Sequence, residues 1–291
     1  MPTNEQRREA AKRKLDRQLA RRAERAKARR RYAVVGSAAS VVLVVGAVVL
    51  IVTLSNRDQK ADATAKQSTP PGTSTAATPV PDNKLVALPV RPKPLPASVD
   101  CQYQVTPQQP PAKPVRPPLA GFTSATGTAQ VTMRTSAGAI GLTLDRALAP
   151  CTVNSFLNLA QHGFYSQSPC HRLVTNPGLQ VLQCGDPTGS GSGGPGYTIP
   201  DEVFPELAYG RGLVAMANTG QPDSGGSQFF LIYGQTQLPP QYTVFASISP
   251  DGLKVLDQIA KAGDDRSLEP QPGGGKPNQP VTITSVDVTA S

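Results

Sequence analysis

Residues 213–233 read LVAMANTGQPDSGGSQFFLIY, and this stretch decides the fold class of the C-terminal half of the chain. Two apolar runs flank a polar segment rich in Gly, Pro, Asp and Ser. Short apolar runs bounded by such turn residues are typical of buried β-strands. Asn218 and Gln228 lie at the inner ends of the two runs. The stretch therefore predicts strands that carry hydrogen-bonding side chains at the edge of an apolar core.

The same pattern of short apolar runs bounded by turn residues extends over residues 120–291, which we interpret as one mainly β domain. Residues 129–144 alternate about a Ser-Ala-Gly turn and predict a hairpin, and YTVFASI and VTITSVDV predict further strands. Residues 151–163 and 251–263 instead place apolar residues at helical spacing, and each segment ends at a Gly suited to a left-handed cap. This order predicts a β-barrel or sandwich capped by two helices.

The N-terminal residues predict a membrane anchor. Residues 1–31 hold 13 Lys/Arg and 4 Asp/Glu, which accounts for the whole net charge of +9. A charge confined to one short tail argues against nucleic acid as a partner. Residues 33–54 are uncharged, and a helix of that length, roughly 33 Å, spans a hydrocarbon core of about 30 Å. We therefore predict a basic cytoplasmic tail at 1–31 and a transmembrane helix at 32–54.

The anchor also predicts the location of the rest of the chain. The apolar run and its basic lead are both too long for a cleaved signal peptide. Because Lys and Arg are enriched on cytoplasmic flanks, the chain is expected to cross the cell membrane once, with its C-terminal domain extracytoplasmic. A juxtamembrane helix lying on anionic lipid is the alternative interpretation of the tail.

Residues 55–119 predict a linker. They contain 14 Pro and one aromatic residue, Tyr103, so they cannot build a core. Closely spaced Pro residues favour a disordered or extended, semi-rigid spacer between membrane and domain. A docking site for a Pro-binding partner is the alternative.

The four Cys predict disulfides, because all of them lie on the predicted outer side of the membrane, where disulfides persist. Four Cys allow three pairings. Two apolar strands lie between Cys170 and Cys184 and could pair antiparallel, which favours this disulfide. That choice leaves Cys101 with Cys151, a bond that would pin the linker to the first helix. The other pairings stay open.

Several kinds of chemistry fit the sequence poorly. A thiol protease would need one of the Cys with His162 or His171 and Asn218, but His171 adjoins Cys170 on a predicted strand, where neighbouring side chains point to opposite faces. A zinc site lacks a Cys-x-x-Cys pair. The Gly-rich run 189–197 lacks the Lys-Ser/Thr of a phosphate loop and predicts a flexible surface loop. We therefore expect neither a metal nor a cofactor.

A set of polar residues within the apolar strands predicts a binding site. If the hairpin between Cys170 and Cys184 forms, Arg172, Gln183 and Asp186 lie close together, and Asn218 and Gln228 add further amides. Such a site has donors and an apolar wall but no obvious nucleophile. In the alternative interpretation Arg172 pairs with Asp186 and the amides hold loop backbone.

These motifs resemble a known family. The ordered segments PCTVNSFLNLA, CHRLV, QCGDPTGSGSGGPGY, LVAMANTG, GSQFFLIY and YTVFA are similar to the cyclophilin type of peptidyl-prolyl cis-trans isomerase, across residues 128–291. Together with the tail, the apolar helix and the spacer, they resemble the membrane-anchored cyclophilins of actinobacteria. The resemblance implies an eight-stranded antiparallel barrel capped by two α-helices.

The resemblance also implies the site. Arg172 corresponds to the catalytic arginine, and no cofactor is involved. An Arg guanidinium can donate to the prolyl nitrogen as the Xaa-Pro bond twists, and can hold the proline carbonyl. The residues implied to line the substrate groove are Gln183, Ala217, Asn218, Thr219, Gln228, Phe230 and Leu238.

The sequence departs from the family pattern at three places. Ten residues separate Arg172 and Gln183 where the family has seven, so Leu179 and Val181 are the candidates for the family's Phe-Met pair. The Trp of many eukaryotic members aligns near Gln237, so we do not expect tight binding of cyclosporin. The groove histidine aligns with Tyr242, whose hydroxyl can also donate a hydrogen bond.

Two functions follow as hypotheses. In the first, the chain is a membrane-tethered isomerase that acts on proline-containing segments of exported proteins and assists their folding. In the second, the same groove is a proline-peptide binding or chaperone module with little or no isomerase activity. Arg172, Gln183, Asn218, Gln228 and Phe230 favour the first, while the altered Phe-Met segment and the missing Trp favour the second.

Overall fold

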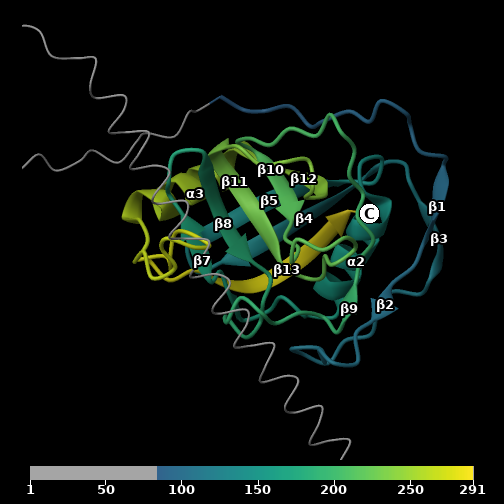
Figure 1. Cartoon of the computed structure of the whole chain (residues 1–291), viewed down its shortest axis with the longest axis horizontal. Helices are drawn as coiled ribbons and strands as arrows, with labels where there is room; N and C mark the ends of the chain where they lie inside the picture. The colour runs from purple at the N-terminus through teal and green to yellow at the C-terminus, as the bar shows by residue number, and fades with distance from the viewer. Residues whose placement is uncertain (1–83, 291) are drawn as a thin grey trace, which may run out of the picture. The chain divides into compact units, whose positions relative to one another are not determined.

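The computed structural model describes residues 84–290, and nine strands of this part form one antiparallel sheet (Figure 1). The strands follow the order β6–β13–β4–β5–β12–β10–β11–β8–β7. Their bounds are β4 Thr128–Thr135, β5 Gly138–Asp145, β6 Ser168–Pro169, β7 Arg172–Val174, β8 Leu179–Cys184, β10 Leu213–Met216, β11 Phe229–Thr236, β12 Val244–Ile248 and β13 Thr282–Ala290. The predicted hairpin at 129–144 is confirmed, because β4 and β5 pair from Thr128↔Asp145 to Thr135↔Gly138.

Two helices cover the curled sheet, as the apolar spacing predicted. They are α2, Pro150–Gln161, and α3, Pro250–Ala262, and Figure 1 places them near opposite ends of the sheet. Phe156 of α2 packs its ring against Phe229 and Phe245, with centroids 5.5 and 5.4 Å apart. Gly163 and Gly263, where the helices were expected to end, both have positive φ values, of 66° and 76°. The core therefore lies between the concave sheet and its two helices.

The sheet differs from the expected eight-stranded closed barrel. The two-residue strand β6 pairs with β13 and adds a ninth strand at one edge. At the other edge, Leu173 of β7 pairs with Gly275 of the loop before β13. The sheet of residues 84–290 is therefore a half-barrel with β6 and β7 as its edge strands, and the contact with Gly275 is an isolated bridge beyond β7.

Residues 84–119, expected to be part of the linker, lie along the domain. They contain β1, Ser98–Cys101, and β2, Gln104–Val105. Strand β1 pairs with β3, Gly121–Ser124, and β2 pairs with β9, Tyr197–Thr198. This part of the predicted spacer is extended, as expected, but the boundary expected at residue 120 falls inside a structure that begins earlier. We refer to residues 84–119 as the arm.

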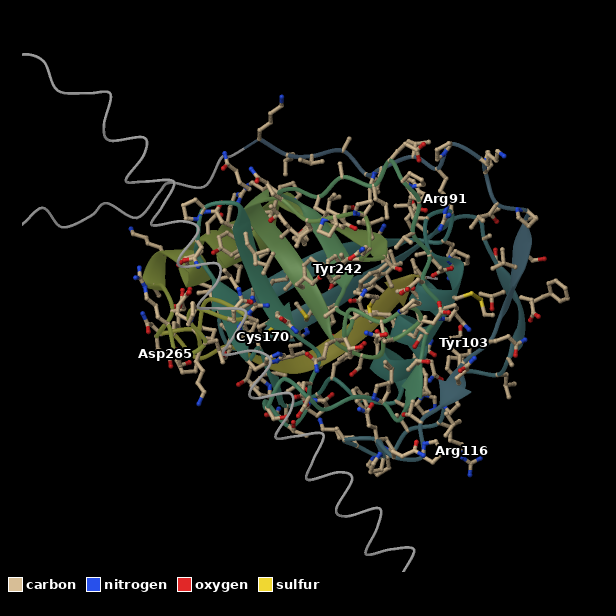
Figure 2. All side chains as sticks on the ribbon, in the orientation of Figure 1. Arg91, Tyr103, Arg116, Cys170, Tyr242 and Asp265 are labelled. Atoms are coloured by element: carbon tan, nitrogen blue, oxygen red, sulfur yellow. A yellow bond between two sulfur atoms is a disulfide. The ribbon has the colours of Figure 1, made fainter. Side chains whose placement is uncertain are left out.

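Three attachments hold the arm against the domain, two of them on α2. Cys101 and Cys151 form a disulfide, which is the pairing expected once Cys170 joins Cys184. Tyr103 donates its hydroxyl hydrogen to the carbonyl of Cys151, 3.0 Å away. Arg91 donates to the carbonyls of Leu148 and Glu202 and lies 5.1 Å from the centre of the Phe204 ring. Figure 2 labels Arg91 and Tyr103 along this face. A Pro-rich segment becomes ordered here because the domain supplies the partners that it lacks by itself.

The predicted tail and transmembrane helix lie outside the described residues. Within residues 84–290, neither helix has the length and apolar character needed to cross a bilayer.

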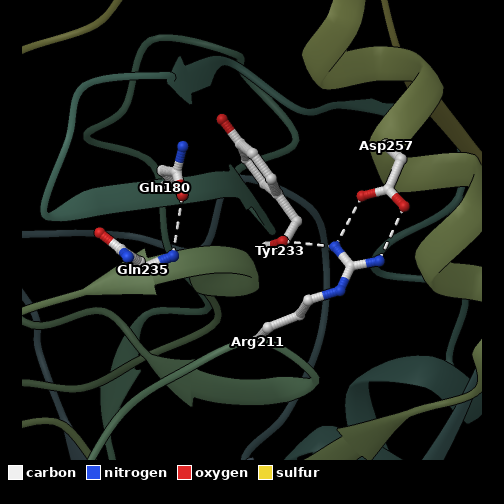
Figure 3. Close-up of polar contacts among 5 residues, drawn as sticks. All are labelled: Gln180, Arg211, Tyr233, Gln235 and Asp257. Atoms are coloured by element: carbon white, nitrogen blue, oxygen red, sulfur yellow. Dashed lines mark hydrogen bonds and ion pairs between the residues drawn. The ribbon is translucent and has the colours of Figure 1, made fainter. Parts of the chain in front are cut away.

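An ion pair joins α3 to the sheet (Figure 3). Arg211, just before β10, donates from both terminal nitrogens to the carboxylate of Asp257 in α3, at 2.6 and 2.7 Å. The Arg211 guanidinium also donates to the carbonyl of Tyr233 in β11. The Arg211 side chain is 8% exposed and that of Asp257 35% exposed, so the arginine depends on these partners more than the carboxylate does. The pair therefore fixes the position of α3 on the sheet.

We expect Asp257→Ala to lower the free energy of unfolding by about 2 kcal/mol, because the buried charge of Arg211 loses its partner. Thermal unfolding of the full chain measures the effect. Asp251→Ala is the matched control on the same helix, since Asp251 pairs only with the exposed Lys254. Equal losses in the two variants would contradict a special role for the Arg211–Asp257 pair.

Candidate functional site

The pairing of β7 with β8 brings the predicted polar residues together. In this hairpin Arg172 lies opposite Gln183, and the disulfide Cys170–Cys184 closes the same end. Arg172 donates from Nη1 to Gln183 Oε1 at 3.1 Å, and Gln183 donates from Nε2 to Gln228 Oε1 at 2.9 Å. Each amide therefore orients the next, and the chain of hydrogen bonds ends on the guanidinium.

A cavity of about 620 Å³ opens beside Arg172. One wall is apolar and comes from β8, β11 and the segment between β11 and β12, while the polar residues form the other wall. The predicted site residues that line it are Arg172, Leu179, Val181, Gln183, Ala217, Asn218, Phe230, Leu238 and Tyr242. The two remaining predicted residues, Thr219 and Gln228, line a neighbouring hollow that shares Gln183, Gly191, Ala217 and Asn218 with this cavity.

Two aromatic rings shape the apolar wall. Phe230 and Tyr242 pack edge to face, with ring centroids 5.6 Å apart. Figure 2 labels Tyr242 near the middle of this face of the domain. The Tyr242 backbone N–H donates to the Tyr209 hydroxyl, while its own hydroxyl makes no hydrogen bond with another residue of the described part. The Tyr242 hydroxyl is therefore available to a ligand, as the sequence suggested.

The side chain and the backbone of Asn218 differ in their hydrogen bonding. Its side-chain Nδ2 donates to the carbonyl of Gln241 at 2.8 Å, and its Oδ1 accepts from the N–H of Gly220 at 3.0 Å. The side chain is thus used to hold its own loop. Within residues 84–290 no hydrogen bond engages the Asn218 backbone, whose N–H and carbonyl can pair with an extended peptide.

The loop between α3 and β13, residues 263–281, supplies contacts that the sequence did not predict. Arg172 donates from Nε to the Gly273 carbonyl at 2.9 Å and from Nη2 to the Pro272 carbonyl at 2.5 Å. Ser267, Leu268, Pro272 and Lys276 of the same loop line the cavity. The sequence EPQPGGGKP of residues 269–277 indicates a loop, but nothing in it points to a partner about 100 residues earlier.

Glu269 anchors this loop. Its Oε1 accepts from the backbone N–H of Gly274 and from Nδ2 of Asn176 in the β7–β8 turn, both at 2.8 Å. These hydrogen bonds keep the pKa of Glu269 below its usual value. The reciprocal backbone bonds of Leu173 with Gly275, at 2.8 and 3.0 Å, attach the loop on the other side. The two carbonyls that hold Arg172 are therefore fixed from both sides.

Charge in the cavity is positive. Burial lowers the pKa of Arg172, while Tyr242 and Glu269 raise it, and the guanidinium stays protonated at all ordinary pH values. Burial also lowers the pKa of His171, a cavity residue that the sequence analysis did not assign to the binding site, so that its imidazole is neutral near pH 7. Arg172 and Lys276 are consequently the charged residues that line the cavity.

Asp186 does not pair with Arg172, contrary to the alternative interpretation of the sequence. The Asp186 side chain is fully buried, and its carboxylate accepts from the backbone N–H groups of Thr188, Gly191 and Gly193 at 2.8 to 3.0 Å. Gln228 donates to the carbonyls of Gly191 and Gly193 on the other side of this loop. The Gly-rich run predicted as a flexible surface loop is thus wrapped around a carboxylate and tied to the site.

Glycine is required at Gly193 because of this wrapping. A Cβ atom there would lie 2.0 Å from Asp186 Oδ1. The composition of the run is thus explained by the close approach of its backbone to Asp186.

Comparisons with known proteins identify the family of the chain. Residues 130–288 match the family model for cyclophilin type peptidyl-prolyl cis-trans isomerases. A protein of Mycobacterium leprae named probable peptidyl-prolyl cis-trans isomerase B is 43% identical, with 98% of this chain and 99% of the relative covered. The protein of that name from Mycobacterium tuberculosis is 49% identical over 64% of this chain, and the match spans 63% of the relative's length.

Solved structures are also similar to this chain. The cyclophilin type peptidyl-prolyl cis-trans isomerase of Cryptosporidium parvum is 28% identical, with a TM-score of 0.48, over 57% of this chain and 99% of that one.

We expect Asp186→Asn to lower the free energy of unfolding by about 2 kcal/mol, because an amide keeps only one accepting oxygen for a loop that donates to both. Burial opposes ionisation of Asp186, but the hydrogen bonds from Thr188, Gly193 and Gly191 outweigh it and hold its pKa below the usual value. The carboxylate therefore stabilises the fold above about pH 4, and this contribution is lost as pH falls through the lowered pKa.

Denaturant unfolding of the full chain at several pH values checks this expectation. The difference between parent and variant should be constant from pH 6 to 8 and should shrink in acid. Asp100→Asn, on the exposed face of β1, is the matched control. A stability difference that is absent at pH 7 would show that the carboxylate does not hold the loop.

Proposed function

Because the chain belongs to the cyclophilin-type peptidyl-prolyl cis-trans isomerase family, we propose that it catalyses rotation about Xaa-Pro bonds with Arg172 as the key donor. Rotation is slow without a catalyst because it must break amide resonance, with a barrier of about 18–20 kcal/mol. A catalyst accelerates it by binding the twisted state more tightly than either planar state. This rotation makes and breaks no covalent bond, so the site needs neither a nucleophile nor a cofactor.

The proposal rests on the number of Arg172 N–H groups that have no acceptor within residues 84–290. A guanidinium has five N–H groups. Three of them donate to Gln183, Pro272 and Gly273, and the part of the chain that the structure describes provides no acceptor for the other two. Arg172 lines the cavity, so these two N–H groups can serve a ligand. One can hold the proline carbonyl while the other donates to the prolyl nitrogen as it becomes pyramidal.

The apolar wall supports binding of the proline ring. Phe230, Leu238 and Val181 line the cavity opposite Arg172, and Leu179 extends the aliphatic surface. Val181 and Phe230 are almost completely buried, at 2% and 6% exposed, so they form a firm floor. The ring would rest on this floor while the backbone of Asn218 pairs with the residue before the proline.

Clients and location are further parts of the proposal. We propose that the isomerase domain lies outside the cell membrane, tethered by residues 32–54, and assists the folding of exported proteins. Support comes from the basic tail at 1–31 and from two disulfides, which persist in oxidising compartments.

A binding module with little or no turnover is the second candidate. Its support is that two N–H groups of Arg172 already donate to the carbonyls of Pro272 and Gly273, the same kind of acceptor that a substrate offers. If these contacts stiffen Arg172 too strongly, the groove binds proline peptides without accelerating rotation.

The activity of the parent separates the two candidates, and Arg172→Ala tests the role of Arg172. We expect kcat/KM for an Ala-Pro test peptide to fall about 100-fold, because the donor that recognises the twisted amide is removed. The measurement is the cis-to-trans rate with the full chain, and Arg134→Ala, an exposed arginine on β4, is the control. A variant as fast as the parent would remove Arg172 from the mechanism. A parent that binds the peptide without accelerating it would establish the binding module.

Glu269→Ala tests whether the loop positions Arg172. We expect kcat/KM to fall about tenfold, mainly through kcat, because the carbonyls of Pro272 and Gly273 are no longer fixed. Glu269→Gln keeps an accepting oxygen and should remain within about twofold of the parent. Asn176→Ala should lose less than Glu269→Ala, because it leaves the hydrogen bond from Gly274 to Glu269 in place. The double variant should lose little more than Glu269→Ala, since the contact of Asn176 is made through Glu269. Glu206→Ala is the exposed control, and an equal loss there would contradict the positioning role.

A further inference from the structure

One segment of the arm, residues 104–112, runs beside the Gly-rich loop that borders the site. Strands β2 and β9 pair with the register Gln104↔Thr198 and Val105↔Tyr197. The pairing continues beyond β2, because Thr106 N–H donates to the Gly196 carbonyl at 2.9 Å and Ala112 N–H to the Gly194 carbonyl at 2.8 Å. In Figure 1, β2 and β9 lie side by side at the edge of the domain. The arm is therefore hydrogen-bonded along the loop rather than merely resting on it.

The contact between arm and loop is also tightly packed. Gly196 has a φ of 79°, and a Cβ atom there would lie 2.7 Å from the side chain of Pro111. The disulfide Cys101–Cys151 holds the preceding part of the arm against α2. Residues 104–112 thus have a fixed place in the described structure, as a wall of a binding site needs.

The second hollow lies between this segment and the site. It has a volume of about 480 Å³ and is bordered by Thr106, Gln109 and Pro110 of the arm. Its inner border includes Asn218 and Gln228. Because Gln183, Gly191, Ala217 and Asn218 line both hollows, the second hollow continues the Arg172 cavity. A peptide chain that leaves the cavity past Asn218 therefore enters a space whose outer wall is the arm.

The lining of the second hollow differs in charge from that of the cavity. Arg172 and Lys276 line the cavity, whereas every side chain that lines the second hollow is uncharged. Its polar groups are the hydroxyls and amides of residues such as Thr106, Gln109, Thr219 and Ser224. The Gln109 carboxamide makes no hydrogen bond within residues 84–290, and only its backbone is used in the turn with Thr106. It is free to bond with a ligand.

We propose that arm residues 104–112 form the outer wall of an extended substrate subsite, and that Gln109 helps to select the residues preceding the proline. The subsite would take uncharged hydrogen-bonding side chains such as Ser, Thr, Asn or Gln. It lies partly outside the matched family region, residues 130–288, so the selectivity belongs to this chain's own arm. The inference rests on the proposed function for the placement of the proline beside Arg172.

Charge variants of Gln109 in the full chain test the proposal. Test peptides carry Glu, Lys or Ser at one, two or three positions before an Ala-Pro unit. We expect Gln109→Arg to raise kcat/KM about threefold for a Glu peptide and to lower it for the matching Lys peptide, and Gln109→Glu to do the reverse. The Ser peptide should be little affected by either charge. The preference should weaken with added salt.

Gln108 provides the matched control, because it is the same residue type at the next position and does not line the hollow. Gln108→Arg and Gln108→Glu should leave the charge preference unchanged. Equal effects at Gln108 and Gln109, or none at Gln109, would overturn the proposal.

Peptide affinity, measured by fluorescence anisotropy on the same variants, separates the two levels of inference. If the parent shows no isomerase activity, the proposed function fails, and the affinities alone decide whether the arm selects peptides. If the parent is active but its peptide affinities and rates ignore Gln109, only the role of the arm fails.

Discussion

The register of β8 between β7 and β11 is the constraint on which the rest of the site depends. Gln183 of β8 lies opposite Arg172 on one side and opposite Phe230 on the other. A shift of one residue would turn Gln183 into the core and face Leu182 to the groove, because side chains alternate along a strand. The disulfide Cys170–Cys184 holds one end of this arrangement. Backbone pairing therefore positions the Arg172 guanidinium, the Gln183 amide and the Phe230 ring before any ligand binds.

Two loops complete the site around β7 and β8. The loop before β13 supplies the Pro272 and Gly273 carbonyls to Arg172, and the run from Thr188 to Gly193 wraps around the buried Asp186. In both places a carboxylate accepts from the backbone of a Gly-rich loop: Asp186 from the N–H groups of Thr188, Gly191 and Gly193, and Glu269 from that of Gly274. Such charge-assisted bonds order segments that have few apolar side chains to bury. Loops that composition alone marks as irregular thereby become walls of a groove.

The groove combines two environments. Beside Arg172 the lining is cationic on one side and apolar on the other. This combination suits a proline, because its ring is apolar and its carbonyl accepts a hydrogen bond. Farther along, the lining is polar without charge, and the arm contributes to it. A peptide crossing both regions would be held through its proline at one and through its preceding residues at the other. The arm is thus joined to the domain in structure and, by our proposal, in recognition.

The sequence by itself determined the mainly β class, the two helices, the β4–β5 hairpin, the family, and nine of the residues that line the cavity, because these depend on local periodicity and on motifs of fixed order. Only the tertiary structure decided that the sheet stays open at β7 and that residues 84–119 belong with the domain. It also decided that Asp186 holds a loop and does not pair with Arg172. The contacts of the Arg172 guanidinium with the Pro272 and Gly273 carbonyls likewise appear only in the folded chain. The disulfide of the arm and the Arg172 contacts join groups at least 50 residues apart, and both Arg172 and Asp186 bind backbone groups. A carbonyl or N–H is the same in every residue, so the sequence carries no local signal of the partner that folding brings to it.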